Sequence, residues 1–353
     1  TRFRGVLLRP LGHATWPDNS TWPEGVPQTT RSARQVPSPN NPGMQTPTSG
    51  VEQDDMATVT PRTLHSTWSP SYVAPRAEAG PEELANAVEL LRGRRVAVLT
   101  GAGISTDSGI PDYRGPDAAP RSPMTFQQFT SDPGFRRHYW ARNHVGWHHM
   151  NATAPNDGHR ALAELERSGV VTGVITQNVD RLHQAAGSRN VIDLHGHYNE
   201  VICLTCGHTQ SRAALDARLL ELNPGFLESL GDLDDVEIAP DADAVIEQTA
   251  HFQVAACEIC GGVLKPNIVY FGENVPKERV AAAYAMIEDA DALLVAGTSL
   301  AVQSGLRLVK RARRDDSPVV ILNRGVTRGD EFAALLLHTG TSDGLRYLAA
   351  NLP

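Results

Sequence analysis

The sequence contains no run of about 18 consecutive apolar residues, so no segment is predicted to cross a membrane. Only three of its 32 Lys and Arg residues are lysine, which we attribute to genome composition. The formal net charge is −8, which argues against general binding to nucleic acids or anionic membranes. Cysteine is scarce, with four residues in 353, which fits a reducing compartment better than a disulfide scaffold. We therefore expect a cytoplasmic location and no nucleic-acid or membrane partner.

The first 75 residues lack a sustained apolar period. They hold 11 of the 24 prolines together with many Ser, Thr and Gln residues. Such a segment buries too little apolar surface to offset the entropy lost on ordering. We expect residues 1–75 to be disordered. The several arginines and few acids of the first 50 residues resemble an organelle transit peptide, whereas a start at Met56 would make residues 1–55 an upstream extension.

From residue 76 onward, apolar runs alternate with helical patterns. Short apolar runs that end in glycine or polar residues predict buried parallel strands, and they occur at 94–103, 169–180, 190–196, 290–300 and 317–325. Helical apolar periods lie between them, at 81–93, 158–168, 276–289 and 304–314. This alternation predicts an α/β fold, a Rossmann-like doubly wound parallel sheet. Its ligand crevice should lie beyond the carboxyl ends of the strands.

An insert that carries all the cysteines interrupts the alternation. We expect residues 197–263 to form a small module. Residues 76–196 and 264–353 should form the Rossmann-like domain, with a helical or loop segment at about 112–155. Within the insert, the acidic stretch 219–250 is expected to be a solvated loop.

Two C-x2-C pairs in the insert have the spacing of a metal site. Cys203 and Cys206 are followed, after 50 residues, by Cys257 and Cys260. Four thiolates can surround one Zn²⁺ tetrahedrally and leave no open position, so the predicted zinc ion is structural. Disulfide bonds are the alternative. Because the insert has little core of its own, metal binding should contribute much of its folding free energy.

A glycine-rich turn follows the first predicted strand. In "TGAGIS", residues 100–105, Gly101 and Gly103 would let backbone amides approach a pyrophosphate. Glycine turns after strands are common, and this one departs from the dehydrogenase fingerprint. Thr106 stands at the third glycine position, and no acidic ribose ligand follows about 20 residues on. The turn therefore fits NAD binding without indicating hydride transfer.

Five motifs in order give the chain a family resemblance. They are "GAGISTDSGIPDYRGPD" (101–117), "TQNVDRLH" (176–183), "LHGH" (194–197) and the two cysteine pairs. Over about residues 80–350 the chain resembles the sirtuins, which are NAD-dependent protein lysine deacylases. The resemblance implies that acylated lysine side chains of proteins are the substrates. It also implies that nicotinamide, O-acyl-ADP-ribose and free lysine are the products.

The resemblance also implies the catalytic residues. His195, at a strand end beside Gly196, matches the histidine that deprotonates a ribose hydroxyl, and an imidazole suits that step. Asn178 and Asp180 would line the nicotinamide pocket. Their alternative role is helix capping, since Asn and Asp after a strand often cap the next helix. Both roles can hold at once. We interpret His183 as structural.

The same resemblance implies the residues that hold NAD. Gln177 would contact the nicotinamide ribose, and the strand ends "GTS" and "NRG" would hold the adenosine half. Tyr113 stands where family members often have Phe, and its ring can still cover the reacting ribose face. The predicted cofactor contacts are Gly101, Ala102, Gly103, Ile104, Ser105, Asp112, Tyr113, Arg114, Gln177, Asn178, Val179, Asp180, Gly297, Thr298, Ser299, Asn323, Arg324, Gly325 and Thr341.

The segment "VYFGE", residues 269–273, corresponds to the edge that pairs with the substrate backbone in sirtuins. An extended peptide would add there as a strand, with contacts from Val269, Phe271, Gly272 and Glu273. The alternative is that Val269 and Phe271 are core residues. We expect alternate side chains to face the core while the backbone stays available.

The segment "RRHYWARNHVGW", residues 136–147, resembles the class II sirtuin branch. Its Tyr139 and Arg142 match a Tyr-x-x-Arg pair that binds the carboxylate of acidic acyl groups in selective members, where arginine can make a bidentate contact. The alternative is a helix with Tyr139 packed and Arg142 solvated. The first interpretation predicts a preference for glutaryl-like groups over acetyl.

The class II resemblance leaves a second function open. A protein mono-ADP-ribosyltransferase would use the same NAD site, and its product would be ADP-ribosylated protein instead of O-acyl-ADP-ribose. A non-catalytic NAD-binding protein is disfavoured, because it would not need His195, Asn178 and Asp180 together.

Overall fold

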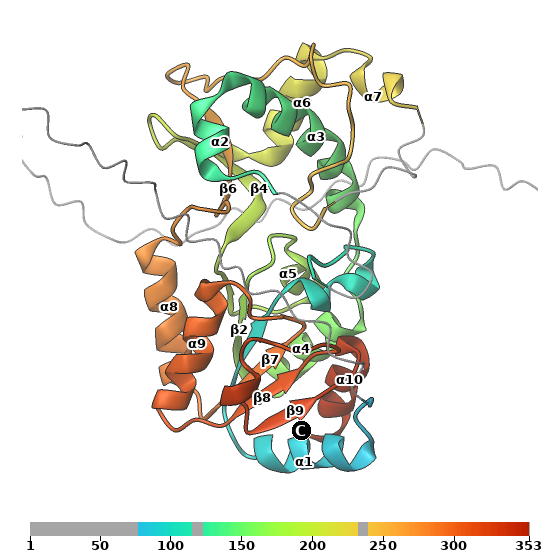
Figure 1. Cartoon of the computed structure of the whole chain (residues 1–353), viewed down its shortest axis with the longest axis vertical. Coiled ribbons are helices and arrows are strands. Elements are labelled where there is room, and N and C mark those ends of the chain that lie inside the picture. Colours follow the sequence, from blue (N-terminus) through green and yellow to red (C-terminus); the bar gives the residue numbers. More distant parts are fainter. Residues whose placement is uncertain (1–76, 115–122, 232–238, 353) are drawn as a thin grey trace, which may run out of the picture. The chain divides into compact units, whose positions relative to one another are not determined.

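The computed structural model describes residues 77–114, 123–231 and 239–352, all within one compact unit, Pro61–Pro353 (Figure 1). The segment 1–75, which we predict to be disordered, lies outside the described residues. Among the described helices, none is both long enough and apolar enough to cross a bilayer.

Six strands form a parallel sheet in the order β3-β2-β1-β7-β8-β9. Their bounds are β1 (Val96–Thr100), β2 (Val171–Thr176), β3 (Val191–Asp193), β7 (Ala292–Ala296), β8 (Val319–Leu322) and β9 (Leu335–Leu337). Counted along this sheet alone, the order is 3-2-1-4-5-6, the order of a doubly wound nucleotide-binding fold. The predicted Rossmann-like sheet is therefore confirmed, with β9 as a strand that the sequence did not indicate.

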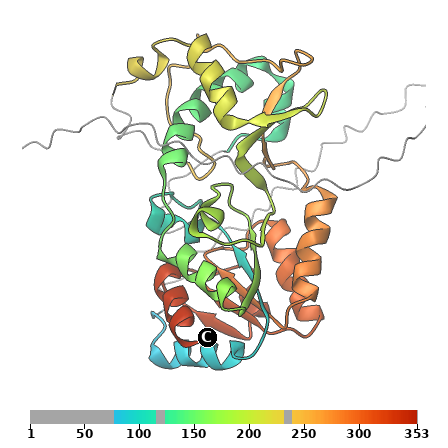
Figure 2. The same ribbon diagram turned by 180° about the vertical axis from the view of Figure 1, so that it is seen from behind.

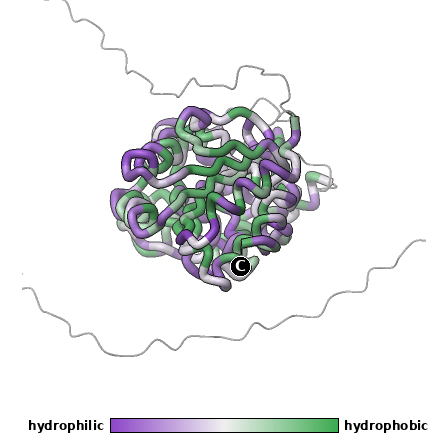
Figure 3. Tube along the Cα trace, turned by 90° about the horizontal axis from the view of Figure 1, so that it is seen from below, coloured by the Kyte–Doolittle hydropathy of each residue, from purple (hydrophilic) through white to green (hydrophobic). Residues whose placement is uncertain are grey.

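Helices cover both faces of this sheet (Figures 1 and 2). One face packs against α1 (Pro81–Leu91), α4 (Asp157–Arg167) and α10 (Thr341–Asn351). The other packs against α8 (Lys277–Glu288) and α9 (Gln303–Arg314). Successive side chains of a strand point to opposite faces, so in β1 Val96 and Val98 enter the first core and Ala97 and Leu99 the second. Seen from below, the hydrophobic trace gathers at the strands in the middle (Figure 3).

A second, antiparallel sheet has the order β5-β4-β6. Its strands are β4 (Gly196–Cys203), β5 (Thr209–Ser211) and β6 (Leu264–Ile268). The nearby helices are α2 (Phe126–Ser131), α3 (Pro133–Ala152), α6 (Arg212–Leu222) and α7 (Phe226–Ser229). Trp140 of α3, Tyr198 of β4 and Leu215 of α6 share one core with residues of β6. The core around this sheet thus draws on α3, which lies outside the predicted insert 197–263; the domain boundaries remain a proposal.

The strand order reverses between β1 and β7, which are paired neighbours: from β1 the chain adds strands toward one edge of the sheet, and from β7 toward the other. The chain leaving β1 passes through two short 3-10 turns, Ala102–Ile104 and Thr106–Ser108, and through α2 and α3, to reach α4 on one face. The chain leaving β7 enters α9 on the other face. Ligands of doubly wound folds bind at such a switch point, and the predicted site residues stand there.

Candidate active site

The glycine turn after β1 packs directly on the turn after β7. The Gly103 N–H donates to the Gly297 carbonyl at 2.8 Å. A side chain at Gly103 would place its Cβ 2.9 Å from that carbonyl oxygen, and one at Gly101 would place it 2.6 Å from the Thr298 Cβ. Gly297 has a φ of +64°, which L-residues rarely adopt. Glycine is therefore required here for the close contact of two backbones, in addition to any role toward a phosphate.

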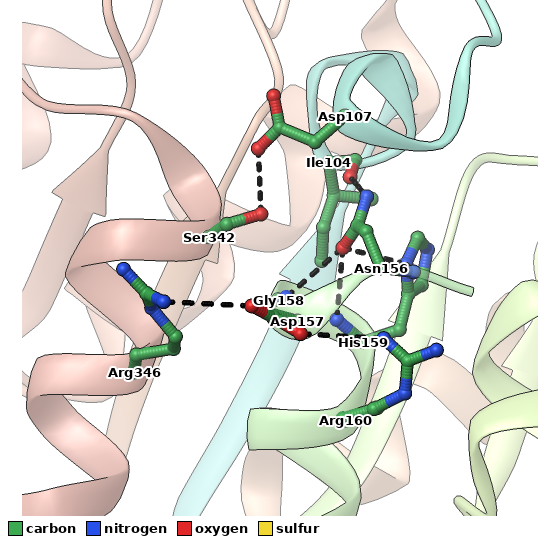
Figure 4. A network of polar contacts seen from close by, with 9 residues as sticks. All are labelled: Ile104, Asp107, Asn156, Asp157, Gly158, His159, Arg160, Ser342 and Arg346. Carbon is green, nitrogen blue, oxygen red and sulfur yellow. Dashed lines mark hydrogen bonds and ion pairs between the residues drawn. The ribbon is translucent and has the colours of Figure 1, made fainter.

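The same turn is held from the other side by α4 (Figure 4). Asn156 caps this helix, with its side-chain oxygen accepting from the Gly158 N–H at 2.9 Å. Its Nδ2 donates to the Ile104 carbonyl at 2.7 Å. Farther along the turn, the Ser342 hydroxyl donates to Asp107 at 2.6 Å. The turn is thus anchored to α4 and to the first residues of α10.

The loop after β2 brings its polar residues onto the glycine turn. Asn178 Nδ2 donates to the Gly101 carbonyl at 3.1 Å and to the Ser105 hydroxyl at 3.0 Å. Ser105 in turn donates to Asp180 Oδ2 at 2.7 Å. The other Asp180 oxygen accepts from the Leu182 N–H at the start of α5 (Leu182–Ala186). The carboxylate therefore caps a helix and belongs to the crevice at the same time.

The carboxyl group of Asp180 is held in a poorly solvated place. Burial raises its pKa above the ordinary value, and the hydrogen bonds from Leu182 and Ser105 oppose that rise only in part. Val179, in contrast, directs its side chain to the core around the smaller sheet. In the loop after β2, the polar residues Asn178 and Asp180 therefore contact the glycine turn, and Val179 does not.

His195 lies between the loop after β2 and the first turn of α9. Its Nδ1 is 3.0 Å from the Gln177 carbonyl oxygen, and its Nε2 is 2.7 Å from the Ser304 hydroxyl. The Gln177 side chain donates to Thr298 Oγ1 at 2.9 Å. Burial lowers the pKa of His195 to about 4, so the imidazole is neutral at pH 7. A neutral imidazole is able to accept a proton, as a general base must.

The remaining predicted cofactor residues surround the same strand ends. Thr341, the first residue of α10, donates its hydroxyl to the Gly103 carbonyl at 3.1 Å. After β8, Asn323 donates to the Gly325 carbonyl at 2.8 Å, and the Arg324 guanidinium lies against Gly340. The Ser299 carbonyl accepts from the Arg328 N–H. The turns after β1, β7 and β8 thus line one edge of the sheet.

The loop before the undescribed residues 115–122 reaches the predicted substrate edge. The Tyr113 ring stands edge-on to the Phe271 ring, with 6.0 Å between centroids. Burial raises the pKa of Tyr113 well above its ordinary value. The backbone N–H of Arg114 bonds the Asp112 side chain at 3.2 Å. These contacts bring the predicted cofactor loop and the predicted substrate edge together.

The edge 269–273 has the alternating burial that we expected. Ile268 and Tyr270 are buried, whereas Val269 and Phe271 are partly exposed. Part of the backbone is already engaged, because the Phe271 carbonyl accepts from the Phe126 N–H at 2.9 Å and the Gly272 carbonyl from the Gln127 side chain. The segment 125–127 is therefore its neighbour on one side.

Glu273 stabilises the backbone of this edge through internal contacts. Its carboxylate pairs with the buried Lys265 at 3.0 Å and accepts from the Tyr270 N–H at 2.9 Å. The Lys265 ammonium lies 4.5 Å from the Tyr270 ring centroid. Together these contacts fix the backbone of the turn. Glu273 therefore influences the predicted substrate edge by holding the conformation of that backbone.

Tyr139 and Arg142 lie on α3 but have different surroundings. Tyr139 is 2% exposed and packs against Phe129, Trp140 and Tyr270. Arg142 Nε is 2.9 Å from Asp243 Oδ1 and 2.6 Å from the Ala244 carbonyl. Tyr139 is thus packed, as in the alternative interpretation, while Arg142 has an internal carboxylate partner instead of being simply solvated.

The four cysteine sulfurs converge within 4.8 Å of one another. The Sγ atoms of Cys203 and Cys260 are 3.6 Å apart, and those of Cys206 and Cys257 are 3.8 Å apart. Tetrahedral Zn–S bonds of about 2.3 Å require sulfur spacings of about 3.8 Å. The set therefore fits one zinc ion with four thiolate ligands and no open position, the arrangement of a structural site.

A second cluster of metal-binding residue types joins α3 and α6. His144 Nδ1 lies 2.9 Å from Asp216 Oδ1, and His148 Nε2 lies 3.5 Å from Asp216 Oδ2. The buried Arg212 also contacts Asp216, at 3.3 Å. Burial alone would raise the pKa of Asp216, but the bond from His144 and the charge of Arg212 lower it overall. Asp216 is the counter-ion of a buried cation, so we interpret the cluster as a salt-bridge network.

Two site neighbours escaped the sequence interpretation. Asn156 precedes a helical pattern and so has a recognisable capping position, but its bond to Ile104 spans 52 residues. Ser304 is 109 residues from His195, and a serine in the first turn of a helix carries no local sign of such a contact. His183, buried against Thr100 at 2.9 Å, has the packed environment that we expected.

The comparisons with known proteins agree on one group. A model of the "Sir2 family" matches residues 101–304. A "NAD-dependent protein deacetylase 1" of Mycobacterium avium (strain 104) is 61% identical over 273 residues, which cover 77% of this chain and 97% of that protein. A protein of the same description from Streptomyces coelicolor is 48% identical, with 75% and 88% covered. The "NAD-dependent protein deacylase SIR4" of Monosiga brevicollis is 47% identical, with 68% and 79% covered.

Solved structures give the same result. The chain matches one described as "Sir2-p53 peptide-NAD+" with a TM-score of 0.61 and 32% identity, covering 76% of this chain and 97% of that one. Another, "Structural Basis for the Mechanism and Regulation of Sir2 Enzymes", matches with a TM-score of 0.60 and 29% identity, covering 77% and 98%.

Proposed function

This chain belongs to the Sir2 family and is an NAD-dependent protein deacylase, and we propose that His195 is its general base. The observation that carries the proposal is the environment of the imidazole. It lies at the switch point of the sheet, bonded at Nδ1 to the Gln177 carbonyl, and burial keeps it neutral. Its Nε2 is therefore the nitrogen that can take a proton.

When bound, NAD would supply the ribosyl carbon that the acyl oxygen attacks, the nicotinamide that leaves it, and the ribose hydroxyl that receives the acyl group. The residues proposed to hold its nicotinamide end are Asn178 and Asp180, which are fixed to the glycine turn through Ser105. Both side chains are already held in the crevice by hydrogen bonds within the protein. We assign the glycine turn and the strand ends after β7 and β8 to the phosphates and adenosine.

The site must keep water from the ribosyl carbon, because water would otherwise compete with the acyl-lysine. Tyr113 is the residue proposed to cover that side. Its ring is partly buried and lies edge-on to Phe271, at the junction of the cofactor loop and the substrate edge.

The substrate is proposed to pair with the backbone of 269–273 as an added strand. The buried Lys265–Glu273 pair supports this, because it holds the turn without using exposed side chains. Main-chain pairing tolerates many sequences, so the edge would accept acyl-lysines from different proteins. A class II preference for acidic acyl groups is the finer hypothesis. It depends on Arg142, whose pairing with Asp243 weighs against it.

The test is nicotinamide release from NAD with a panel of acyl-lysine peptides, followed by mass spectrometry of every product. His195→Ala is measured beside the wild type. We expect acyl-dependent release with matching O-acyl-ADP-ribose, and a loss of at least about 100-fold in the variant. Release without acyl dependence, with ADP-ribose on protein, would instead indicate a transferase. An active His195→Ala variant would refute His195 as the base.

A further inference from the structure

Ser304 lies where the proposed base meets α9. Its side chain is 6% exposed, and its hydroxyl oxygen is 2.7 Å from His195 Nε2. On the opposite side of the ring, Nδ1 is 3.0 Å from the Gln177 carbonyl oxygen. The imidazole is thus held at both nitrogens by groups from two different loops.

These two contacts determine the tautomer. A carbonyl oxygen only accepts hydrogen bonds, so the hydrogen of the neutral ring must lie on Nδ1 and point to Gln177. Nε2 then carries the lone pair, and the Ser304 hydroxyl is the donor in the second bond. This is the tautomer in which Nε2 can act as a base.

We propose that Ser304 is a positioning residue for the deacylation reaction, which orients His195 in the Nδ1–H tautomer that the Gln177 carbonyl sets. The inference rests on the proposed function, in which His195 Nε2 takes the proton of a ribose hydroxyl. The serine hydroxyl occupies Nε2 in the free enzyme and gives way to the substrate hydroxyl. In that step the O–H bond of the ribose hydroxyl breaks and an Nε2–H bond forms. The Nδ1–H group meanwhile remains hydrogen-bonded to the Gln177 carbonyl.

The chain around Ser304 is built to hold this arrangement. Ser304 is the second residue of α9 and precedes Gly305. A Cβ at Gly305 would lie 2.8 Å from Gln177 Oε1, so the helix start packs directly on the residue that holds Nδ1. The Gln177 side chain also bonds Thr298, which leads into the same helix. One segment, 298–305, therefore supports both partners of the imidazole.

The charges near the ring act in the same direction. Burial is the main cause that disfavours the imidazolium, the Gln177 bond opposes it, and the charge of Arg279 on α8 adds a smaller effect in the same direction as burial. The N-terminal end of α9 carries a partial positive charge, which also favours a neutral ring. A hydroxyl donating to Nε2 stabilises the neutral form further, so removing it should make the ring more basic.

The experiment measures the tautomer and the pKa of the His195 imidazole directly, in the enzyme without ligand. Protein labelled with 15N-histidine is titrated by NMR, with His195→Gln used to assign the signal. We expect the Nδ1–H tautomer in the wild type. Ser304→Ala should keep that tautomer, because Gln177 still accepts from Nδ1–H, but show a pKa raised by about half a unit or more. Ser304→Thr, which keeps the hydroxyl, should restore the wild-type signal.

Kinetics give the second readout. Loss of one hydrogen bond predicts a kcat about 3- to 10-fold lower in Ser304→Ala, with the KM for NAD changed less than about 2-fold. The acid limb of the pH profile should move to higher pH. Gln303→Ala, on the same turn but exposed, controls for weakening of the helix start. If Ser304→Ala does not fold, Ser304→Cys, of similar size with a weaker donor, replaces it.

The outcomes separate this inference from the proposed function. An unchanged pKa in Ser304→Ala, or a faster enzyme, would overturn the positioning role while His195→Ala remained inactive. An active His195→Ala enzyme would instead remove the base assignment, whatever the NMR signal of the serine variants.

Discussion

Arg142 on α3 forms a salt bridge with Asp243, with 2.9 Å between Nε and Oδ1. The Arg142 side chain is 23% exposed and the Asp243 side chain 10%, so the pair is largely shielded from water. An acidic acyl group that sought this guanidinium would have to compete with a carboxylate already in place. A preference for acidic acyl groups therefore depends on whether such a group can displace Asp243 from Arg142.

The Asp243→Asn variant tests that competition. Removing the charge leaves Arg142 without its internal carboxylate, so we expect the ratio of glutaryl-lysine to acetyl-lysine activity to rise about 5-fold, equivalent to about 1 kcal/mol. The ratio of kcat/KM values for two matched peptides measures it. Adding Arg142→Ala should abolish the gain. An unchanged ratio in both variants would place the guanidinium outside the acyl pocket.

Zinc removal should unfold the core around the smaller sheet. The four sulfurs have the spacing of a closed tetrahedral site, and metal binding in such a site is coupled to folding. We expect Cys203→Ser to release the metal, to lower the melting temperature by more than about 10 °C and to abolish turnover. Metal analysis, circular dichroism and nicotinamide release measure the three effects.

The control for the zinc prediction is Thr205→Ala, beside a ligand but supplying no sulfur, which should retain metal. A fully zinc-free enzyme with unchanged melting and activity would contradict the structural role of the ion.

Asn156 has two separable tasks, capping α4 and holding the Ile104 carbonyl. Asn156→Ala loses both and should destabilise the protein by about 1–3 kcal/mol in urea unfolding. Asn156→Asp keeps a capping acceptor but sets an anionic oxygen against the Ile104 carbonyl. It should keep most of the stability and bind NAD about 5- to 10-fold more weakly by calorimetry.

Asp157→Asn changes the charge at the same helix start without touching the glycine turn, and serves as the matched variant. Equal NAD affinity in Asn156→Asp and the wild type would show that the Ile104 contact does not shape the cofactor site.

Acid should destabilise the protein mainly through three histidines. Burial lowers the pKa of His159 and of His195 from 6.5 to about 4, and that of His183 well below 6.5. Below pH 6.5 the unfolded chain binds protons that the folded protein excludes, so stability is complete above that pH and falls toward pH 4. Each ring contributes a slope of about 1.4 kcal/mol per pH unit. Asp180 opposes this, because its raised pKa lets the folded protein bind a proton first.

Urea midpoints at pH 7.5, 6 and 5 measure the acid effect. His159→Gln should reduce the slope by about one third, because it removes one of the three histidines whose pKa values are most strongly lowered. His149→Gln, at an exposed position, should not change it. A midpoint independent of pH across this range would refute the proposed protonation states.

Local pattern was enough for much of the fold. Buried strands such as β1 and β7 are continuous apolar runs followed by glycine. In the helices between the strands, apolar residues recur every three to four positions. The cysteine pairs gave the metal ligands because a C-x2-C turn is itself local. The short strand β9 lacked any such length, and α10 begins at Thr341, which we had predicted only as a cofactor contact.

The sequence by itself determined the fold class, the family and the set of residues gathered at the strand ends, because each is written in short contiguous motifs. Only the tertiary structure decided what those residues touch. The Ser304 contact with His195 and the Arg142 pair with Asp243 join segments about a hundred residues apart, which no local pattern encodes. Packing also brought α3 into the core of the smaller sheet, since buried aromatic rings join whichever apolar surface lies nearest in space.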